Sequence, residues 1–154
     1  MDIKRVIIGS DHAGFALKEK LKAHLRKKGV RVKDVGAFSQ ERSDYPGFAF
    51  DLAKAVAGKK FSRGILVCKT GIGNSIVANR LAGVRAALCY NTDAARLSRE
   101  HNDSNVLVLG SHFVKEKQAR KILDIWLSTE FQGGRHKRRL RQIEDIEERI
   151  RDEQ

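Results

Sequence analysis

Short apolar runs alternate five times with longer segments of helical periodicity, and this alternation restricts the chain to a small set of folds. The apolar runs lie at 5–9, 30–36, 63–68, 84–90 and 104–110. Segments with helical spacing follow each of them, at 14–29, 44–59, 73–83, 91–102 and 115–131. Strands that alternate with helices predict a parallel sheet, because parallel neighbours need a crossover connection that covers a face of the sheet. The connections are short, so we expect one α/β domain over residues 1–154 with a five-stranded parallel sheet.

The last segment, 135–154, departs from this pattern. It is highly charged and has a thin apolar seam at helical spacing, formed by Leu140, Ile143, Ile146 and Ile150. A helix this polar is not expected to be buried within its own subunit. The seam predicts a contact with a second copy of the chain at a subunit interface. The alternative is a surface helix folded back on the sheet.

Charge and composition narrow the possible partners and location. The formal net charge of +12 favours anionic partners, either nucleic acid or small phosphorylated molecules, although a solvated basic surface is the plainer interpretation. One Trp and two Tyr give little support for a nucleic-acid stacking surface. There is no apolar run long enough to span a membrane and no secretory signal pattern. Cys68 and Cys89 lie in apolar stretches and are expected to be reduced, so we predict a cytoplasmic protein.

Chemically active side chains follow several of the predicted strands. In open parallel sheets, ligands bind beyond the carboxyl ends of the strands. Asp11 and His12 follow the first strand, and Cys68 ends the third. The helix between the fourth and fifth strands ends in His101 and Asn102. We therefore expect these groups to gather at one edge of the sheet, as a catalytic site requires.

The stretch "CKTGIGNS", residues 68–75, places a cysteine before a glycine-rich turn. A Walker loop would need Gly-Lys-Ser/Thr at the start of the helix, but here Lys69 precedes the glycines. A dinucleotide fingerprint would need a small residue at position 76, which is Ile. A cysteine phosphatase loop would need arginine at position 74, which is Asn. None of these three loop types is predicted.

What remains is a pocket lined by backbone amides beside a thiol. A helix N-terminus and Lys69 are both expected to favour the thiolate of Cys68. A thiolate next to an oxyanion hole can remove a proton from a carbon adjacent to a carbonyl, while the amides hold the enediolate. A buried structural cysteine is the alternative.

Six motifs together resemble one family. They are "GSDHAGF", "SDYP", "CKTGIGNSIVANR", "GVRAALCYN", "EHNDSNVLVLG" and "GGRHKRR". In this order and over about residues 4–145, the chain resembles the type B ribose-5-phosphate isomerases, a family that includes the galactose-6-phosphate isomerase subunits. The resemblance implies a Rossmann-like three-layer αβα sandwich that acts as a homodimer or a dimer of dimers. It also implies aldose–ketose isomerisation of a sugar phosphate through a cis-enediolate, without a metal or organic cofactor and without nucleic acid or membrane partners.

Position by position, the resemblance implies a catalytic role for several residues. Cys68 would be the base that moves a proton between the first two sugar carbons, and Thr70 would assist proton transfer between the two oxygens. His101 would open the furanose ring, with Asp11 nearby. The enediolate would be held by backbone amides, namely those of Gly71, Gly73, Asn74 and Ser75.

The same resemblance implies the residues that hold the substrate. Asn102 and Tyr45 would line the sugar. The phosphate would be gripped by His12, Arg135 and Arg139, with some of these groups reaching in from a partner subunit. Taken by spacing alone, Arg135 and Arg139 share a helix face and suit a phosphate, but they also suit a plain basic stripe. His101 also suits a capping or core role, and Asp11 also suits a turn.

Two positions depart from the family pattern. Lys69 stands where the family usually has glycine, which places a long cation at the lip of the pocket and affects the expected substrate size. His112 stands where many members have an arginine that helps to hold phosphate. "EHND" favours ribose 5-phosphate over galactose 6-phosphate, while allose and tetrose phosphates stay open. A non-enzymatic binder of phosphorylated ligands or nucleic acid is the competing class.

Overall fold

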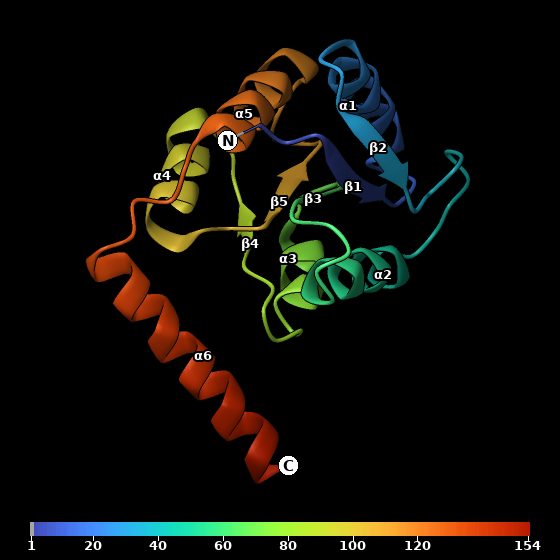
Figure 1. The fold of residues 1–154 in the computed structure, drawn as a ribbon. Helices are drawn as coiled ribbons and strands as arrows, with labels where there is room; N and C mark the ends of the chain where they lie inside the picture. The colour runs from blue at the N-terminus through green and yellow to red at the C-terminus, as the bar shows by residue number, and fades with distance from the viewer. Residues whose placement is uncertain (1) are drawn as a thin grey trace.

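The computed structural model describes residues 2–154 and has one parallel five-stranded sheet in the order β2-β1-β3-β5-β4 (Figure 1). The strands are β1 (Arg5–Ser10), β2 (Arg31–Asp34), β3 (Gly64–Cys68), β4 (Ala86–Leu88) and β5 (Val106–Gly110). The helices are α1 (Phe15–Lys27), α2 (Tyr45–Ala57), α3 (Ile72–Ala78), α4 (Thr92–Asn102), α5 (Glu116–Ser128) and α6 (Arg135–Glu153). The α/β fold with a five-stranded parallel sheet is confirmed.

Helices cover both faces of the sheet and create two apolar layers. One layer packs α1, α4 and α5 against the sheet, with Leu21 and Trp126 fully buried in it. The other packs α2 and α3 against the opposite face around Leu52. Strand β3 contributes to both layers because its side chains alternate between the faces, and all five of its residues are buried. The predicted three-layer αβα sandwich follows from this arrangement.

The predicted elements occur within a few residues of their expected bounds, with one clear exception. The helix expected over 73–83 begins at Ile72 and ends at Ala78. Its next residue, Asn79, uses its side-chain amide to bond both backbone groups of Ala86, at 3.0 and 2.8 Å. Asn79 thereby occupies part of the free edge of β4, and this interaction ends the helix early.

Helix α6 extends away from the body of the molecule, which it contacts mainly near α4 (Figure 1). Farther along, the Glu147 carboxylate accepts hydrogen bonds from the Gly83 backbone N–H at 3.2 Å. The seam residues Ile143, Ile146 and Ile150 are about half exposed. A role of α6 at a subunit interface stays a prediction. No helix within residues 2–154 is long and apolar enough to cross a membrane.

A buried ion cluster anchors the loop that follows β2. The Lys18 ammonium group is fully buried, donates to both oxygens of Asp34 at 2.8 and 2.9 Å, and also donates to the carbonyl of Ala37. Lys22 donates to the same carboxylate at 2.7 Å, and so does the Gly36 N–H at 2.8 Å. Burial raises the pKa of Asp34, but the hydrogen bonds from the two lysines and Gly36 outweigh it and hold the pKa below its ordinary value. The loop from this cluster leads directly to Tyr45.

Replacing Asp34 by asparagine is expected to lower the free energy of unfolding by about 3 kcal/mol at pH 7, because it leaves the Lys18 charge buried and unpaired. Urea unfolding followed by circular dichroism measures this. Since the folded-state pKa of Asp34 is lowered, its contribution is present above pH 3.8 and is lost as the pH falls further. Asp2→Asn, which removes an exposed pair with Lys4, should change the stability by less than about 1 kcal/mol. Equal effects of the two variants would contradict the anchoring role.

Candidate active site

The order of the strands creates a crevice at the carboxyl ends of β1 and β3. The chain leaves β1 for α1 on one face of the sheet and leaves β3 for α3 on the other, so the two connections diverge. Ser10 of β1 pairs with Val67 of β3, which sets the next residues, Asp11 and Cys68, side by side. Both line a cavity of about 400 Å³ together with Tyr45, Thr70 and other residues of the glycine loop. The sequence prediction of a pocket at this edge agrees with the structure.

Cys68 lies at the base of this cavity. It is 4% exposed, and its sulfur accepts a hydrogen bond from the Gly71 N–H at 3.1 Å. Gly71 has a φ of +84°, and a Cβ there would lie 3.2 Å from the backbone carbon of Leu109. Only glycine can therefore turn the chain this tightly and still present its amide to the thiol.

The pKa of Cys68 differs from what the loop alone suggests. Burial has the largest effect and raises the pKa of the thiol above its ordinary value of 9.0, and the neighbouring Asp11 carboxylate raises it further. The backbone N–H groups of Gly71, Asn74 and Thr70 lower it, but they do not outweigh burial. The expectation that the free thiol is mainly ionised is therefore wrong, because desolvation of the sulfur was not visible in the sequence.

The other amides of the loop differ in their availability. The Ser75 N–H donates to the Gly71 carbonyl at 3.0 Å inside α3, and the Ser75 hydroxyl donates to Ile72 at 2.8 Å. Ser75 is thus engaged within the helix, whereas Asn74 directs its backbone N–H toward the sulfur. Asn74 is also buried, and its side-chain Nδ2 has no hydrogen-bond partner within the described residues.

Tyr45 forms the wall of the cavity opposite the thiol. It is the first residue of α2, and its ring packs directly on Gly73, where a Cβ would lie 2.6 Å from the phenol oxygen. The Thr70 hydroxyl accepts from the Ile72 N–H at 3.2 Å, and the Thr70 carbonyl accepts from the Tyr90 hydroxyl at 3.2 Å. Two aromatic hydroxyl groups, from α2 and from the residue that follows β4, therefore border the glycine loop.

His12 is held by the loop that precedes α2. Its backbone N–H donates to the Ser43 hydroxyl at 3.1 Å, and its ring Nδ1 lies 3.0 Å from the Ser43 carbonyl oxygen and 3.2 Å from the Ser43 nitrogen. Asp11 accepts from the Gly14 N–H at 3.0 Å, which orients its carboxylate at the start of α1. These contacts fix the His12 ring through Nδ1 and leave Nε2 as the atom for a ligand.

Four of the predicted site residues lie away from this edge of the sheet within one subunit. They are His101, Asn102, Arg135 and Arg139. Helix α4 starts at the carboxyl end of β4 and runs back across the sheet, so its last residues lie at the opposite, amino edge. Asp103 and Asn105 there bond Arg85, which precedes β4. The expectation that His101 and Asn102 share an edge with Cys68 is therefore wrong for a single chain.

At the amino edge, these residues form a separate group. The His101 ring stacks on the ring of His136 with centroids 4.2 Å apart. His136 is buried, and burial lowers its pKa, as do the charges of His101, Arg135 and Arg139. Arg135 and Arg139 are exposed on α6, and Asn102 is also exposed. The exposed side chains of Asn102, Arg135 and Arg139 are thus available to a molecule that binds next to α6.

Sequence reasoning gave no role to Ser43 and Tyr90, although both contact residues predicted for the site. Tyr90 lies two residues beyond the last residue of β4, Leu88, and this position is a signal that it lies at the carboxyl edge. Among the departures, Lys69 is exposed at the lip of the cavity, and the His112 N–H donates to its carbonyl at 2.9 Å. His112 is exposed as well and packs edge-on against Phe113. Both residues therefore lie beside the cavity that holds Cys68.

The chain is similar to known proteins over nearly its whole length. Residues 6–143 match the family model described as "Ribose/Galactose Isomerase". The chain is 48% identical to ribose-5-phosphate isomerase B of Escherichia coli K12, over 96% of this chain and 99% of that protein.

Solved structures are similar over almost the whole chain. Ribose-5-phosphate isomerase B of Clostridium thermocellum superposes with a TM-score of 0.93 at 46% identity, covering 95% of this chain and 99% of that one. The enzyme of Mycoplasma genitalium, solved with bound ribulose 5-phosphate, gives a TM-score of 0.90 at 40% identity, covering 94% and 96% of the two chains.

Proposed function

Since this chain belongs to the ribose/galactose isomerase family and is a sugar-phosphate aldose–ketose isomerase, we propose that it interconverts ribose 5-phosphate and ribulose 5-phosphate with Cys68 as the base. The observation that carries the proposal is the position of the Cys68 sulfur, at the base of a cavity and beside the amides of the glycine loop. The relatives named for ribose 5-phosphate support the choice of substrate. We place the reaction in the cytoplasm, because both cysteines are free and buried.

The proposed reaction moves one proton between neighbouring carbons. The Cys68 thiolate removes the proton from C2 of the open-chain aldose. The electron pair of that C–H bond forms the C1–C2 double bond of a cis-enediolate, and the π pair of the C1 carbonyl moves onto O1. The resulting thiol returns a proton to C1, while a proton moves from O2 to O1 near Thr70. The N–H groups that surround the sulfur stabilise negative charge, first on the thiolate and then on the enediolate oxygen. No metal or organic cofactor takes part in this scheme.

A second copy of the chain completes the site in this proposal. Cys68, Asp11 and Tyr45 lie at one edge of the sheet, whereas His101 and the arginines of α6 lie at the other, so one chain cannot bring them together. Exposed apolar side chains border the cavity and suit a protein partner better than solvent. They include Ile72, Ile76, Tyr90 and Phe113. We therefore propose a homodimer, or a dimer of dimers, in which His101, Asn102, Arg135 and Arg139 of one copy approach the Cys68 cavity of the other.

In the proposed complex, ring opening and phosphate binding come from these approaching groups. His101 protonates the ring oxygen of the furanose and so releases the open-chain aldehyde, and Asn102 contacts the sugar. Arg135 and Arg139 share one face of α6 and bind the phosphate together with His12, as charge-assisted donors do. The exposed Lys69 adds positive charge at the lip of the cavity, and His112 lies next to it.

Activity on ribose 5-phosphate is tested by following proton exchange in D₂O. The enzyme, assayed with EDTA present, should form ribulose 5-phosphate and incorporate deuterium at C1, because the proton on the thiol exchanges with solvent. Proton NMR measures both quantities. Allose 6-phosphate, galactose 6-phosphate and a tetrose phosphate serve as comparison substrates and should react more slowly. Conversion without deuterium incorporation would contradict the cysteine base. Failure to convert any sugar phosphate, together with tight binding of duplex DNA at physiological salt, would support a binding protein instead.

The rate is expected to rise with pH. The thiolate is the active form, and burial raises the pKa of Cys68 above 9.0, so the ionised fraction increases about tenfold per pH unit below that pKa. A plot of log kcat/KM for ribose 5-phosphate against pH should therefore climb between about pH 7 and pH 9. A profile that is flat over this range would show that the base already has a lowered pKa and would contradict the environment described for Cys68.

A further inference from the structure

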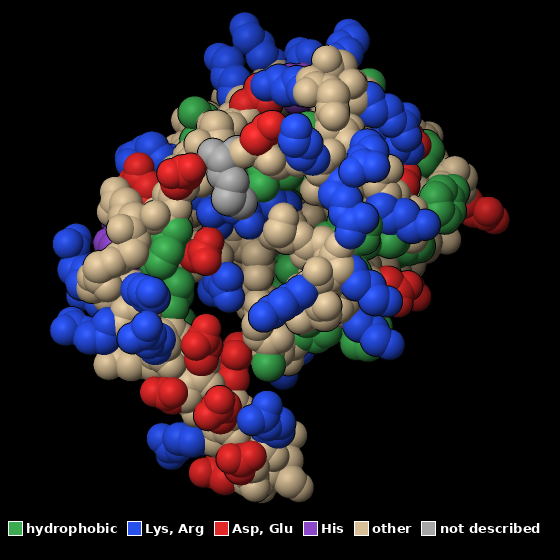
Figure 2. All heavy atoms as spheres, in the orientation of Figure 1, with side chains coloured by type: hydrophobic (Ala, Val, Ile, Leu, Met, Phe, Trp, Pro, Cys, Tyr) green, Lys and Arg blue, Asp and Glu red, His purple; other side chains and the backbone are tan. Residues whose placement is uncertain are grey.

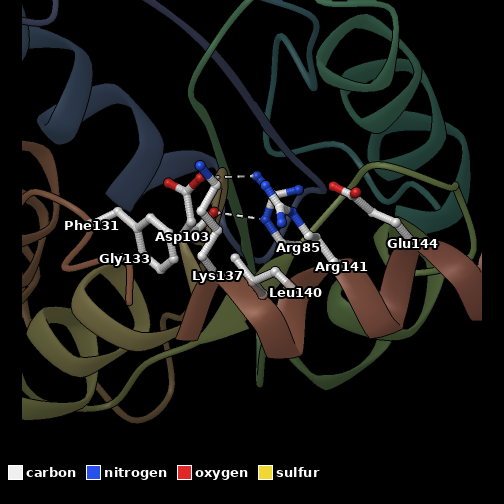
Figure 3. A pocket seen from close by; sticks show the side chains of 8 residues that line it. All are labelled: Arg85, Asp103, Phe131, Gly133, Lys137, Leu140, Arg141 and Glu144. Atoms are coloured by element: carbon white, nitrogen blue, oxygen red, sulfur yellow. Dashed lines mark hydrogen bonds and ion pairs between the residues drawn. The ribbon is translucent and has the colours of Figure 1, made fainter. Parts of the chain in front are cut away.

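A groove separates α6 from the amino edge of the sheet, on the side of the molecule away from Cys68. Two cavities of about 440 and 420 Å³ share Arg85, Asp103 and Glu144 and so form one continuous groove. Figure 2 shows the hollow where α6 leaves the body, with basic and acidic side chains around it. Figure 3 shows Arg85 directed at Asp103, with Arg141 and Glu144 beside it on α6.

Arg63 lies at the inner end of this groove as a buried cation. It directly precedes β3, lines the 420 Å³ cavity and is 7% exposed. Its Nη1 donates to the Ser62 carbonyl at 2.9 Å, and its guanidinium lies 5.8 Å from the centroid of the Trp126 ring. Its Nε is buried and has no hydrogen-bond partner in residues 2–154. A donor of this kind, next to an open cavity, points to a ligand that supplies an acceptor.

The neighbouring charges leave Arg63 without a carboxylate of its own. The charge of Asp103 acts on Arg63, but Asp103 already pairs with Arg99 at 2.7 Å and with Arg85 at 3.4 Å. Burial lowers the pKa of Arg63 to about 10, and repulsion from Arg99 and Arg85 contributes to this, so Arg63 stays charged at neutral pH. A buried charge without a partner is unfavourable, and a bound anion would neutralise it.

The remainder of the groove is also rich in positive charge. Five of its described lining residues are cationic, namely Lys59, Arg63, Arg85, Lys137 and Arg141, against the two carboxylates of Asp103 and Glu144. Lys137 and Arg141 are two positions away from Arg135 and Arg139, which places the two pairs on opposite sides of α6. The groove is therefore a different surface from the one that we propose to grip the substrate phosphate.

We propose that this groove is a second anion site that binds a small molecule carrying phosphoryl groups, with the guanidinium of Arg63 as its inner contact. Guanidinium groups match phosphate oxygens in geometry and charge. Arg63 and Arg85 line the same cavity, and two guanidinium groups suit a ligand with two phosphoryl groups better than one with a single carboxylate. The cavity of about 420 Å³ is large enough for a small molecule that carries phosphoryl groups. The proposed anion site does not depend on the reaction proposed for Cys68, because the groove and the Cys68 cavity share no lining residue.

Calorimetric titration of the full-length protein with pyrophosphate tests the site. Arg63→Met keeps an unbranched apolar stem but removes the guanidinium, and it should weaken one class of pyrophosphate sites by about tenfold or more. Arg31→Met, which removes an exposed charge from β2, should change the same affinity by less than about twofold. Lys59→Gly is a second variant at the lip of the groove. Lys59 has a φ of +60°, which glycine adopts readily, so this variant should fold and also bind pyrophosphate more weakly.

Three results of these titrations would contradict the proposed anion site. A wild-type protein that binds no pyrophosphate would overturn the proposal. Equal affinity and stoichiometry in wild type and Arg63→Met would do the same, because all binding would then belong to the substrate-phosphate site. If Arg63→Met does not fold, undiminished pyrophosphate binding by Lys59→Gly would count against the groove.

Discussion

Replacing Cys68 by alanine is expected to lower kcat for ribose 5-phosphate by about 10²–10⁴-fold while the fold is retained. The sulfur is the only atom removed, and it is the proposed carrier of the proton. Cys68 lies at the base of a cavity and belongs to neither apolar layer, so its loss should cost little stability. Steady-state kinetics measures the activity, and circular dichroism with thermal unfolding measures the fold.

Two further variants make this result specific. Cys68→Ser keeps a hydrogen-bonding atom in the same place, but a hydroxyl group ionises far less readily than a thiol, so serine should be nearly as inactive as alanine. Cys89→Ala removes the other buried thiol, which lies in the apolar layer between the sheet and α4, and it should keep its kcat. An active Cys68→Ala variant would remove the proposed base. Equal losses in Cys68→Ala and Cys89→Ala would indicate damage to the fold instead.

The fold was largely predictable from the sequence because its strands, helices and helix caps each have a recognisable local sequence pattern. Buried strands such as 64–68 appear as unbroken apolar runs, and α1 shows its buried face at Leu17, Leu21 and Leu25. The start of α4 is an example at the level of one residue: asparagine favours helix caps, and the Asn91 side chain accepts from the Ala94 N–H at 2.7 Å. The early end of α3 was not predictable, because it depends on the contact of the Asn79 side chain with Ala86 at the edge of the folded sheet.

The site was predictable only in part, for a related reason. Asp11, Cys68 and the glycine loop directly follow strands, so chain order alone places them at one edge. His101 and Asn102 are the last residues of α4, and a crossover helix returns its end to the opposite edge. The raised pKa of Cys68 also depends on how deeply the loop is packed, which a sequence does not specify. The position of His101 at the edge opposite Cys68 provides the strongest test of the proposed homodimer.

Mixing two inactive variants is expected to restore activity if each site takes Cys68 from one copy and His101 from the other. Cys68→Ala and His101→Asn homodimers should each be nearly inactive. After subunit exchange in equal amounts, about half of the dimers contain one chain of each kind, and one of their two sites has both native residues, so about a quarter of wild-type activity should return. The rate with ribose 5-phosphate before and after exchange measures this effect.

A matched pair of variants shows whether such recovery comes from shared sites. Cys68 and Thr70 line the same cavity within one chain, so mixing Cys68→Ala with Thr70→Val leaves every site with one defect and should restore nothing. Recovery in both mixtures would indicate refolding or contamination by wild-type enzyme. No recovery in either mixture, with exchange verified by a tagged chain, would mean that His101 acts in its own subunit. Helix α4 would then have to move away from the amino edge, where Asp103 and Asn105 bond Arg85 and so fix its end.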